Sequence, residues 1–285
     1  MKFRSFIVSI SPPFLVPILN KTLIFLRLKR EVKTYLYSPT WHTIVSGPLQ
    51  GREIFVDPHD GYWQREVVEG NYDQFFFDYL KRFNLKGKTI FDVGAHIGYH
   101  ALSFARLVGS EGKVYAFEPN PHNIERFQKI LTKNKDLEQR IKILDFAISD
   151  KNDETIFHFN SNIENGQSSG GYVSGAHTPS TEKEYKIMGF KQSTVQTVSI
   201  DKFCNSLVTY EPPLIIKIDV EGAENLVLEG AADTLRKNKT CVLLEIHSIF
   251  NALHASNFFK ELGYSLELIH ENSDGRCFVS ATPKP

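Results

Sequence analysis

Two short pairs of ionisable side chains have types and spacing that suit acid–base or metal chemistry. Asp219 and Glu221 are two residues apart, and so are Glu245 and His247. On an extended strand, residues two apart share a face, so each pair can point one way. The imidazole could accept the proton of a hydroxyl group, or it could join the carboxylates in holding a Mg²⁺-like ion. We expect Asp219, Glu245 and His247 to act as base or orienting groups, with a metal site as the alternative.

Nearby charged residues also have structural explanations. Glu221 and Glu224 are favourable acids for the first turn of a helix, and His247 could simply cap a strand. Lys217 lies in an otherwise apolar strand, which is costly unless a carboxylate pairs with it. We expect its role to be structural rather than catalytic.

A glycine-containing turn earlier in the chain is typical of a nucleotide site. Residues 88–94 predict a strand that ends in Asp92-Val93-Gly94, and Gly98 opens the next helix without a side chain to block a ligand. Glu118 ends the following strand, where an acid can accept hydrogen bonds from ribose hydroxyls. The turn lacks G-x-G-x-x-G, yet this unit alone leaves a nicotinamide-dependent oxidoreductase open.

Strands and helices alternate along the chain, which predicts a doubly wound, mostly parallel α/β sheet. In such a sheet, ligands bind beyond the carboxyl ends of the strands, so both groups of polar residues should meet at one edge. Two final strands, 264–270 and 276–281, suit an antiparallel hairpin at the sheet edge. The other predicted strands are 88–94, 114–118, 141–149, 154–159, 194–200, 214–220 and 240–247, and the predicted helices include 97–108, 119–131, 221–235 and 251–262.

One stretch breaks this alternation. Residues 160–193 contain five glycines and six serines, with little apolar periodicity. A long irregular segment between two strands of the core is usually functional or disordered. We expect a lid or substrate loop that brings Ser168 and Ser169 to the site, with surface disorder as the alternative.

Composition and charge exclude several classes of protein. The 285 residues carry 33 Lys+Arg and 33 Asp+Glu, so no basic excess indicates a nucleic-acid partner. The 41% of hydrophobic residues excludes a disordered chain. Three cysteines without CxxC spacing favour a reducing compartment over a disulfide scaffold or zinc site. We therefore expect a cytoplasmic protein.

The first 30 residues differ from the rest. They contain six basic residues and no acid, so the remaining residues hold an excess of acids. Three prolines at positions 12 to 17 argue against a membrane-spanning helix, which needs about 20 apolar residues. Residues 18–27 form a basic amphipathic segment that suits an anionic membrane surface. We expect peripheral contact with the inner face of a membrane through residues 1–30, with a helix packed on the domain as the alternative.

Three segments carry a resemblance to a known family: DVGAHIGYHALSFA from residue 92, VYAFEPNPHNIERF from residue 114, and IIKIDVEGAENLVLEGA from residue 215, with LLEIH after it. Over roughly residues 70–270 the chain resembles the FkbM family of S-adenosylmethionine-dependent methyltransferases. The resemblance implies a class I, Rossmann-like fold and O-methylation of a hydroxyl on a sugar, glycan, glycolipid or natural product. Residues 61–285 would form the methyltransferase domain and residues 1–60 a lead-in. A methyltransferase fold that binds without turnover is the non-enzyme alternative.

The resemblance also implies contacts with S-adenosylmethionine. Glu118 would hold the ribose hydroxyls, and Asp219 would reach toward the methyl-transfer site. The family commonly has asparagine at the position of His96 and often glutamate at that of Asp73. The implied cofactor residues are Asp73, Asp92, Gly94, Ala95, His96, Gly98, Glu118, Pro119, Asn120, Asp145, Phe146 and Ala147.

Overall fold

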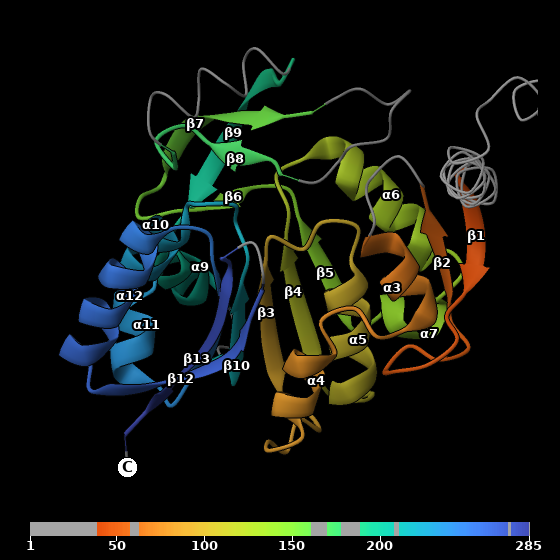
Figure 1. The fold of residues 1–285 in the computed structure, drawn as a ribbon, viewed down its shortest axis with the longest axis horizontal. Helices are drawn as coiled ribbons and strands as arrows, with labels where there is room; N and C mark the ends of the chain where they lie inside the picture. Colours follow the sequence, from red (N-terminus) through yellow and green to blue (C-terminus); the bar gives the residue numbers. More distant parts are fainter. Residues whose placement is uncertain are drawn as a thin grey trace, which may run out of the picture.

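Seven strands form a central sheet in the order β12-β13-β11-β10-β3-β4-β5 (Figure 1). Neighbours from β11 to β5 pair in parallel. The strand order reverses between β3 and β10, because β3 leads to β4 on one side and β10 leads to β11 on the other. This confirms the predicted doubly wound, mostly parallel sheet. The strands are β3 (Thr89–Val93), β4 (Lys113–Phe117), β5 (Ile141–Leu144), β10 (Ile215–Ile218), β11 (Cys241–Ile246), β12 (Tyr264–Glu271) and β13 (Cys277–Pro283).

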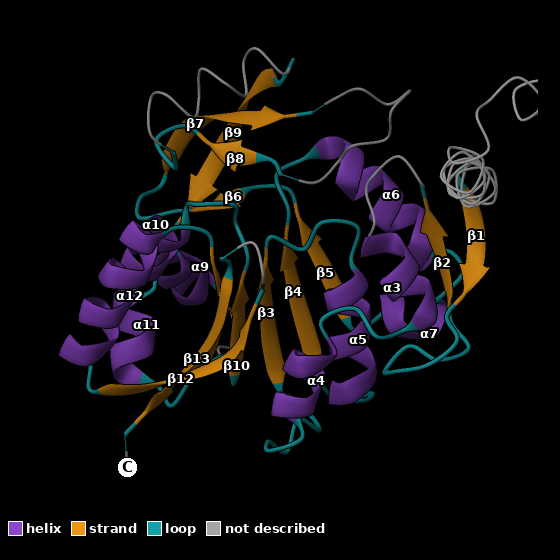
Figure 2. Cartoon of the chain, in the orientation of Figure 1, coloured by secondary structure: helices purple, strands orange, loops and turns teal. Residues whose placement is uncertain are grey.

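Helices cover both faces of this sheet (Figure 2). Successive residues on a strand point to opposite faces, so Ile90 packs into one core and Phe91 into the other. Helices α3 to α7 contribute to the first core and α9 to α12 to the second. The helices are α3 (Trp63–Glu69), α4 (Gln74–Leu80), α5 (Tyr99–Val108), α6 (Pro121–Leu131), α7 (Lys135–Glu138), α9 (Ile200–Ser206), α10 (Glu224–Glu229), α11 (Ala232–Lys237) and α12 (Ile249–Glu261).

The predicted C-terminal hairpin forms at the sheet edge. Strand β13 is antiparallel to both of its neighbours, β11 and β12. It lies between them, so the outermost strand is β12 and not the last strand of the chain. The register opposes Glu245 to Phe278 and Ile246 to Cys277. The start of β13 therefore lies beside the end of β11.

A second, four-stranded sheet has the order β6-β9-β7-β8. The predicted strand 141–149 is wrong as one element, because β5 ends at Leu144 and residues 147–148 pair with β9. As the outermost strand, β5 has only β4 to pair with, and their pairing ends at Phe117 and Leu144. Residues 160–193 thus connect strands of the second sheet rather than of the central one. Its strands are β6 (Ala147–Ile148), β7 (Asp153–Phe159), β8 (Tyr172–Val173) and β9 (Lys191–Val198).

The predicted helix 221–235 is also divided, into α10 and α11. Gly230 stands between them, and a Cβ at this position would lie 2.0 Å from the carbonyl oxygen of Ser149. The backbone N–H of Asp201 donates to the carbonyl of Gly230. The chain bends where it packs closely against two other segments.

The computed structural model describes residues 39–57, 63–160, 170–177, 189–207, 211–272 and 275–284. Residues 1–30, Ser168, Ser169 and the boundary between residues 60 and 61 lie outside them, so the membrane contact and the domain boundary stay predictions. Strands β1 (Thr40–Thr43) and β2 (Glu53–Val56) pair with each other and share the first core through Ile54 and Val56. Within the described ranges, no helix has both the length and the apolar character that crossing a membrane requires.

Gly98 allows two helices to pack closely. Its φ is 88°, in the left-handed region, just before α5. A Cβ there would lie 2.1 Å from Cε2 of Phe127, whose ring is buried on α6. A large side chain here would therefore first disturb the fold, and the expected cofactor contact of Gly98 stays a prediction.

Replacing Gly98 by alanine should lower the free energy of unfolding by about 3 kcal/mol, because left-handed backbone and overpacking both add cost. Gly51→Ala is the matched control, since Gly51 has a φ of 79° and no heavy atom within 4 Å of the added Cβ. It should lose only about 1 kcal/mol. Urea unfolding followed by circular dichroism measures both variants. Equal losses would contradict the packing role of Phe127.

Candidate active site

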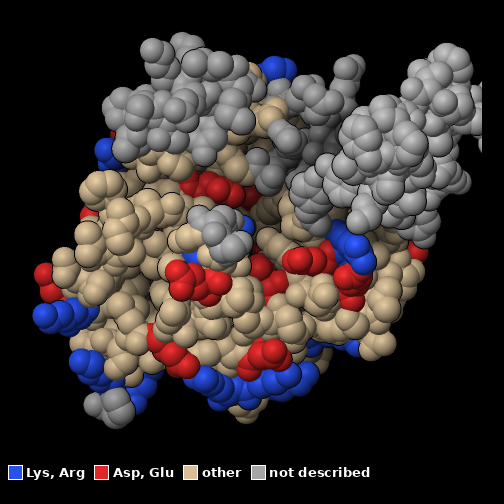
Figure 3. Space-filling view, in the orientation of Figure 1, with Lys and Arg blue, Asp and Glu red and all other residues tan. Residues whose placement is uncertain are grey.

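A cavity of about 780 Å³ opens beyond the carboxyl ends of β3 and β10, where the strand order reverses. Ligands of open parallel sheets bind at this place. The turns after β3 and β10, the end of β4, the start of α4 and the C-terminal hairpin line it. Acidic side chains surround a hollow in the middle of this face (Figure 3).

Three non-glycine residues in the described chain have left-handed backbone, and all three line this cavity. They are Asp73, His96 and Glu221, with φ values of 48°, 52° and 51°. Such conformations are uncommon outside glycine and concentrate at functional sites. The chain accepts this backbone cost where it surrounds the cavity.

The structure separates the predicted cofactor residues into two groups. Asp73, Gly94, Ala95, His96 and Glu118 line the large cavity. The others do not, so their predicted contacts receive no support from its shape: Asp92, Gly98, Pro119, Asn120, Asp145, Phe146 and Ala147.

Each residue of the second group has an identifiable local environment. Asn120 caps α6, because its side-chain oxygen accepts a hydrogen bond from the backbone N–H of His122. Asp145 is exposed in the break between β5 and β6. Pro119 and Ala147 line a separate small cavity of about 40 Å³ that also touches Gly94. Ala147 therefore lies near Gly94 in the turn after β3, because both residues line this small cavity.

Glu118 joins the turn after β3 to the start of α6. Its Oε2 accepts a hydrogen bond from the backbone N–H of His96 at 2.7 Å. Its Oε1 accepts from the backbone N–H of Asn120 at 2.9 Å and from the side chain of Asn123 at 3.2 Å. Burial raises the pKa of Glu118 to about 7, although these hydrogen bonds oppose the rise.

Lys217 has the carboxylate partners that the sequence predicted. Its Nζ lies 3.3 Å from Oδ2 of Asp219 and 3.6 Å from Oδ1 of Asp92. Lys217 and Asp92 are fully buried. Burial lowers the pKa of Lys217, but the nearby carboxylates raise it above its ordinary value, so the side chain stays charged. Asp92 therefore supports the floor of the cavity through Lys217.

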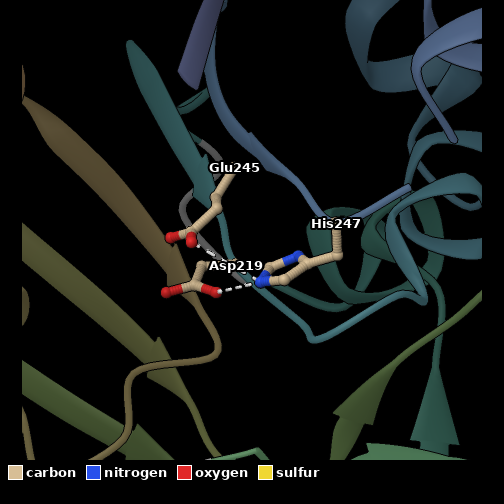
Figure 4. Close-up of side chains that lie close together, drawn as sticks. All are labelled: Asp219, Glu245 and His247. Carbon is tan, nitrogen blue, oxygen red and sulfur yellow. Dashed lines mark ion pairs between the residues drawn. The ribbon is translucent and has the colours of Figure 1, made fainter. Parts of the chain in front are cut away.

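Asp219, Glu245 and His247 converge, as the spacing predicted (Figure 4). The Nε2 of His247 lies 3.5 Å from Oε1 of Glu245 and 3.8 Å from Oδ1 of Asp219. Oε2 of Glu221 lies 3.5 Å from the same Nε2 of His247. Asp219 and Glu221 line the large cavity, whereas Glu245 and His247 lie behind them.

Glu224 orients His247, which the sequence interpretation missed. Its Oε1 lies 2.9 Å from Nδ1 of His247 and also accepts from the backbone N–H of Gly222. The side-chain amide of Asn251, from α12, donates to Oε2 of Glu224. Burial lowers the pKa of His247, but the Glu224 hydrogen bond and the neighbouring carboxylates raise it more, to about 10. In the sequence, Glu224 looks like an ordinary acid in the first turn of a helix. It differs from one by being fully buried, which the sequence does not reveal.

Arg276 and the aromatic wall are further site residues that local sequence patterns did not place. The Nη1 of Arg276, just before β13, lies 2.7 Å from Oε1 of Glu245. Trp63 and Tyr72 line the cavity, and the ring of Trp63 packs edge-on against His96. Gly170 shows that the described part of the 160–193 stretch reaches the cavity.

The Glu118 carboxyl predicts a pH dependence of stability. Its folded pKa lies above the ordinary value of 4.5, so it favours folding while protonated, and this contribution is lost as pH rises from about 4.5 through 7. Glu118→Gln should therefore gain stability relative to the wild type by up to about 3 kcal/mol across that range. Urea unfolding at pH 4.5, 6 and 7.5 measures the difference. The exposed Glu138→Gln is the control, and a pH-independent difference for Glu118→Gln would contradict the assignment.

Residues 92–266 match the profile described as the methyltransferase FkbM domain. Hexuronic acid methyltransferase AglP of Haloferax volcanii is 29% identical over 187 residues, which cover 65% of this chain and 67% of that protein. The 2-O-methyltransferase NoeI of Sinorhizobium fredii is 29% identical over 154 residues, which cover 53% of this chain and 60% of that protein.

A crystal structure of methyltransferase FkbM from Methylobacillus flagellatus has the same fold, with a TM-score of 0.52 and 18% identity. The match covers 72% of this chain and 46% of that one, so this chain spans less than half of that longer protein. The family profile covers more than half of the present chain and includes the end of β3, all of β4, β10 and β11, and the turns after β3 and β10 that line the cavity. The chain therefore belongs to the FkbM methyltransferase family and has its class I, Rossmann-like fold.

Proposed function

We propose that this protein transfers a methyl group from S-adenosylmethionine to a hydroxyl group of a sugar or glycan. One observation carries the proposal: the cavity at the strand reversal is lined on one side by the β3 turn and Glu118, and on the other by Asp219 and Glu221. The β3 turn and Glu118 suit a nucleoside cofactor, and the carboxylates of Asp219 and Glu221 suit acid–base chemistry on an acceptor hydroxyl. Family membership makes S-adenosylmethionine the donor that this arrangement favours over a nicotinamide.

The charges of the cavity support a cationic cofactor. Asp73, Glu118, Asp219 and Glu221 line it, and oppositely charged walls raise the local concentration of a charged ligand. S-adenosylmethionine carries a sulfonium and an ammonium group, which such walls attract. The cavity volume of about 780 Å³ lies within the usual range for small-molecule sites.

The acceptor class is proposed from the relatives. Two curated relatives are named for methylation of hexuronic acid and for 2-O-methylation. Arg276 lines the same cavity with a partly exposed side chain that also contacts Glu245, so a cationic group borders the space for an acidic or hydroxyl-rich acceptor. A sugar or glycan hydroxyl is the acceptor chemistry that these observations favour.

The reaction is an in-line displacement. The acceptor oxygen forms a bond to the methyl carbon while the carbon–sulfur bond breaks, and its electron pair goes to sulfur to give neutral S-adenosylhomocysteine. The hydroxyl proton passes to the carboxylate of Asp219, which lines the cavity, either directly or through water. Positioning of the two reactants supplies much of the acceleration, and proton removal adds roughly 10²–10⁴-fold.

Asp219→Asn should lower turnover by at least about 100-fold, because it removes the carboxylate that faces both the cavity and His247. Affinity for S-adenosylmethionine should change much less, within about threefold. Calorimetry measures binding, and transfer of the tritiated methyl group to a panel of neutral sugars and uronic acids measures turnover. His254→Asn, in an exposed histidine–glutamate pair on α12, should leave both unchanged.

Equal losses of binding and turnover in Asp219→Asn would contradict a role in the transfer step. Binding of S-adenosylmethionine without a methylated product from any sugar would favour a non-catalytic binding protein. Absence of binding would overturn the proposed function itself.

A further inference from the structure

We propose that Asp219, Glu245 and His247 bind one divalent cation of the Mn²⁺ or Mg²⁺ class at the wall of the cavity. The binding site stands on the geometry alone. The role of the ion, which is to hold and polarise the acceptor oxygen, rests on the proposed methyl transfer.

The spacing of the three side chains matches a shared ion. One ligand atom from each lies within 4.8 Å of the others, and Nε2 of His247 is 3.5 and 3.8 Å from the two carboxylates. Atoms that coordinate one ion at about 2.1 Å are roughly 3 to 4 Å apart. The two separations from Nε2 are ones that a single ion spans, and the two carboxylates lie within 4.8 Å of each other.

The orientation of His247 points to a ligand. Its Nδ1 is held by Glu224, and Glu224 is held in turn by Gly222 and Asn251. The Nε2 is buried, makes no hydrogen bond and faces the carboxylates, while the side chain is only 9% exposed. In metal-ligating histidines, the other ring N–H characteristically donates a hydrogen bond to an acceptor such as a carboxylate, which fixes the tautomer and the orientation of the ring.

The local charge favours a cation. Asp92, Asp219, Glu221, Glu224 and Glu245 are joined in one connected set of contacts. Among the described residues, the permanent cations in contact with that set are Lys217, which lies against Asp92 and Asp219, and Arg276, which lies against Glu245. An excess of buried or partly buried carboxylates is costly. A divalent ion beside His247 would offset it.

The remaining coordination positions would face the reactants. Asp219 and Glu221 line the cavity, whereas Glu245 and His247 close the site from behind. An ion held by three side chains on one side keeps open positions for water or a hydroxyl oxygen, and coordination lowers the pKa of that oxygen. Carboxylates suit Mg²⁺ and Mn²⁺, and a single imidazole makes Mn²⁺ the better probe.

The test is Mn²⁺ binding to the full chain after treatment with EDTA, followed by electron paramagnetic resonance of free Mn²⁺ with and without S-adenosylhomocysteine. We expect one bound ion per chain, with affinity lowered at least tenfold in Glu245→Gln and His247→Asn. Glu224→Gln keeps all three ligands but loses the group that fixes the ring, so it should weaken binding by about 10-fold to 100-fold. His254→Asn and Glu229→Gln form the matched control, because this second histidine–glutamate pair is solvent-exposed.

The outcomes separate this inference from the proposed function. Circular dichroism melting shows whether each variant is folded. If a variant of a ligand residue does not fold, Glu224→Gln still tests the site, because it keeps all three ligands and should weaken Mn²⁺ binding. No Mn²⁺ binding, together with methyl transfer that is unaffected by EDTA, would overturn the metal site and leave the function standing. Saturable Mn²⁺ binding that the site variants abolish, without binding of S-adenosylmethionine, would support the metal site and overturn the function. Equal Mn²⁺ binding in site and control variants would also overturn the site.

Discussion

A buried ammonium group determines much of the architecture of this site. Lys217 is 1% exposed in the middle of the sheet, and an unpaired charge there would cost several kcal/mol. Asp92 on β3 and Asp219 after β10 therefore have to stay beside it. Because Lys217 takes Oδ2 of Asp219, the other oxygen, Oδ1, is the one turned toward His247. One structural ion pair thus sets the direction of a functional carboxylate.

The sheet topology explains why this pairing lies under a cavity. Strands β3 and β10 are neighbours at the point where the chain turns from building one side of the sheet to building the other. Gly94 allows the turns that follow them to approach closely, since a Cβ there would lie 1.7 Å from the carbonyl oxygen of Asp219. The residues that we propose to face the cofactor and those that we propose to face the acceptor therefore meet at one edge, although Glu118 and Asp219 are more than 100 residues apart in sequence.

The sequence predicted those features that depend on strand spacing and on the cost of burial. The i, i+2 pairs at Asp219 and Glu245 placed their side chains on one edge, and the isolated Lys217 required a carboxylate. The contacts of Glu224 and Arg276 could not be predicted in this way, because they depend on how α10 and the C-terminal hairpin pack against β11. The packing contact of Gly98 and the division of the predicted helix 221–235 at Gly230 were missed for the same reason: their partners, Phe127 and Ser149, come from other elements. Periodicity reveals the face of an element but not what packs on it.

The most direct test of this account is a crystal structure of the protein with S-adenosylhomocysteine. The account predicts that the ligand occupies the cavity at the strand reversal, with its ribose beside Glu118 and its sulfur facing the side of Asp219 and Glu221. A cofactor bound elsewhere, or one whose sulfur points away from Asp219, would contradict the central claim that the ends of β3 and β10 form the site of methyl transfer.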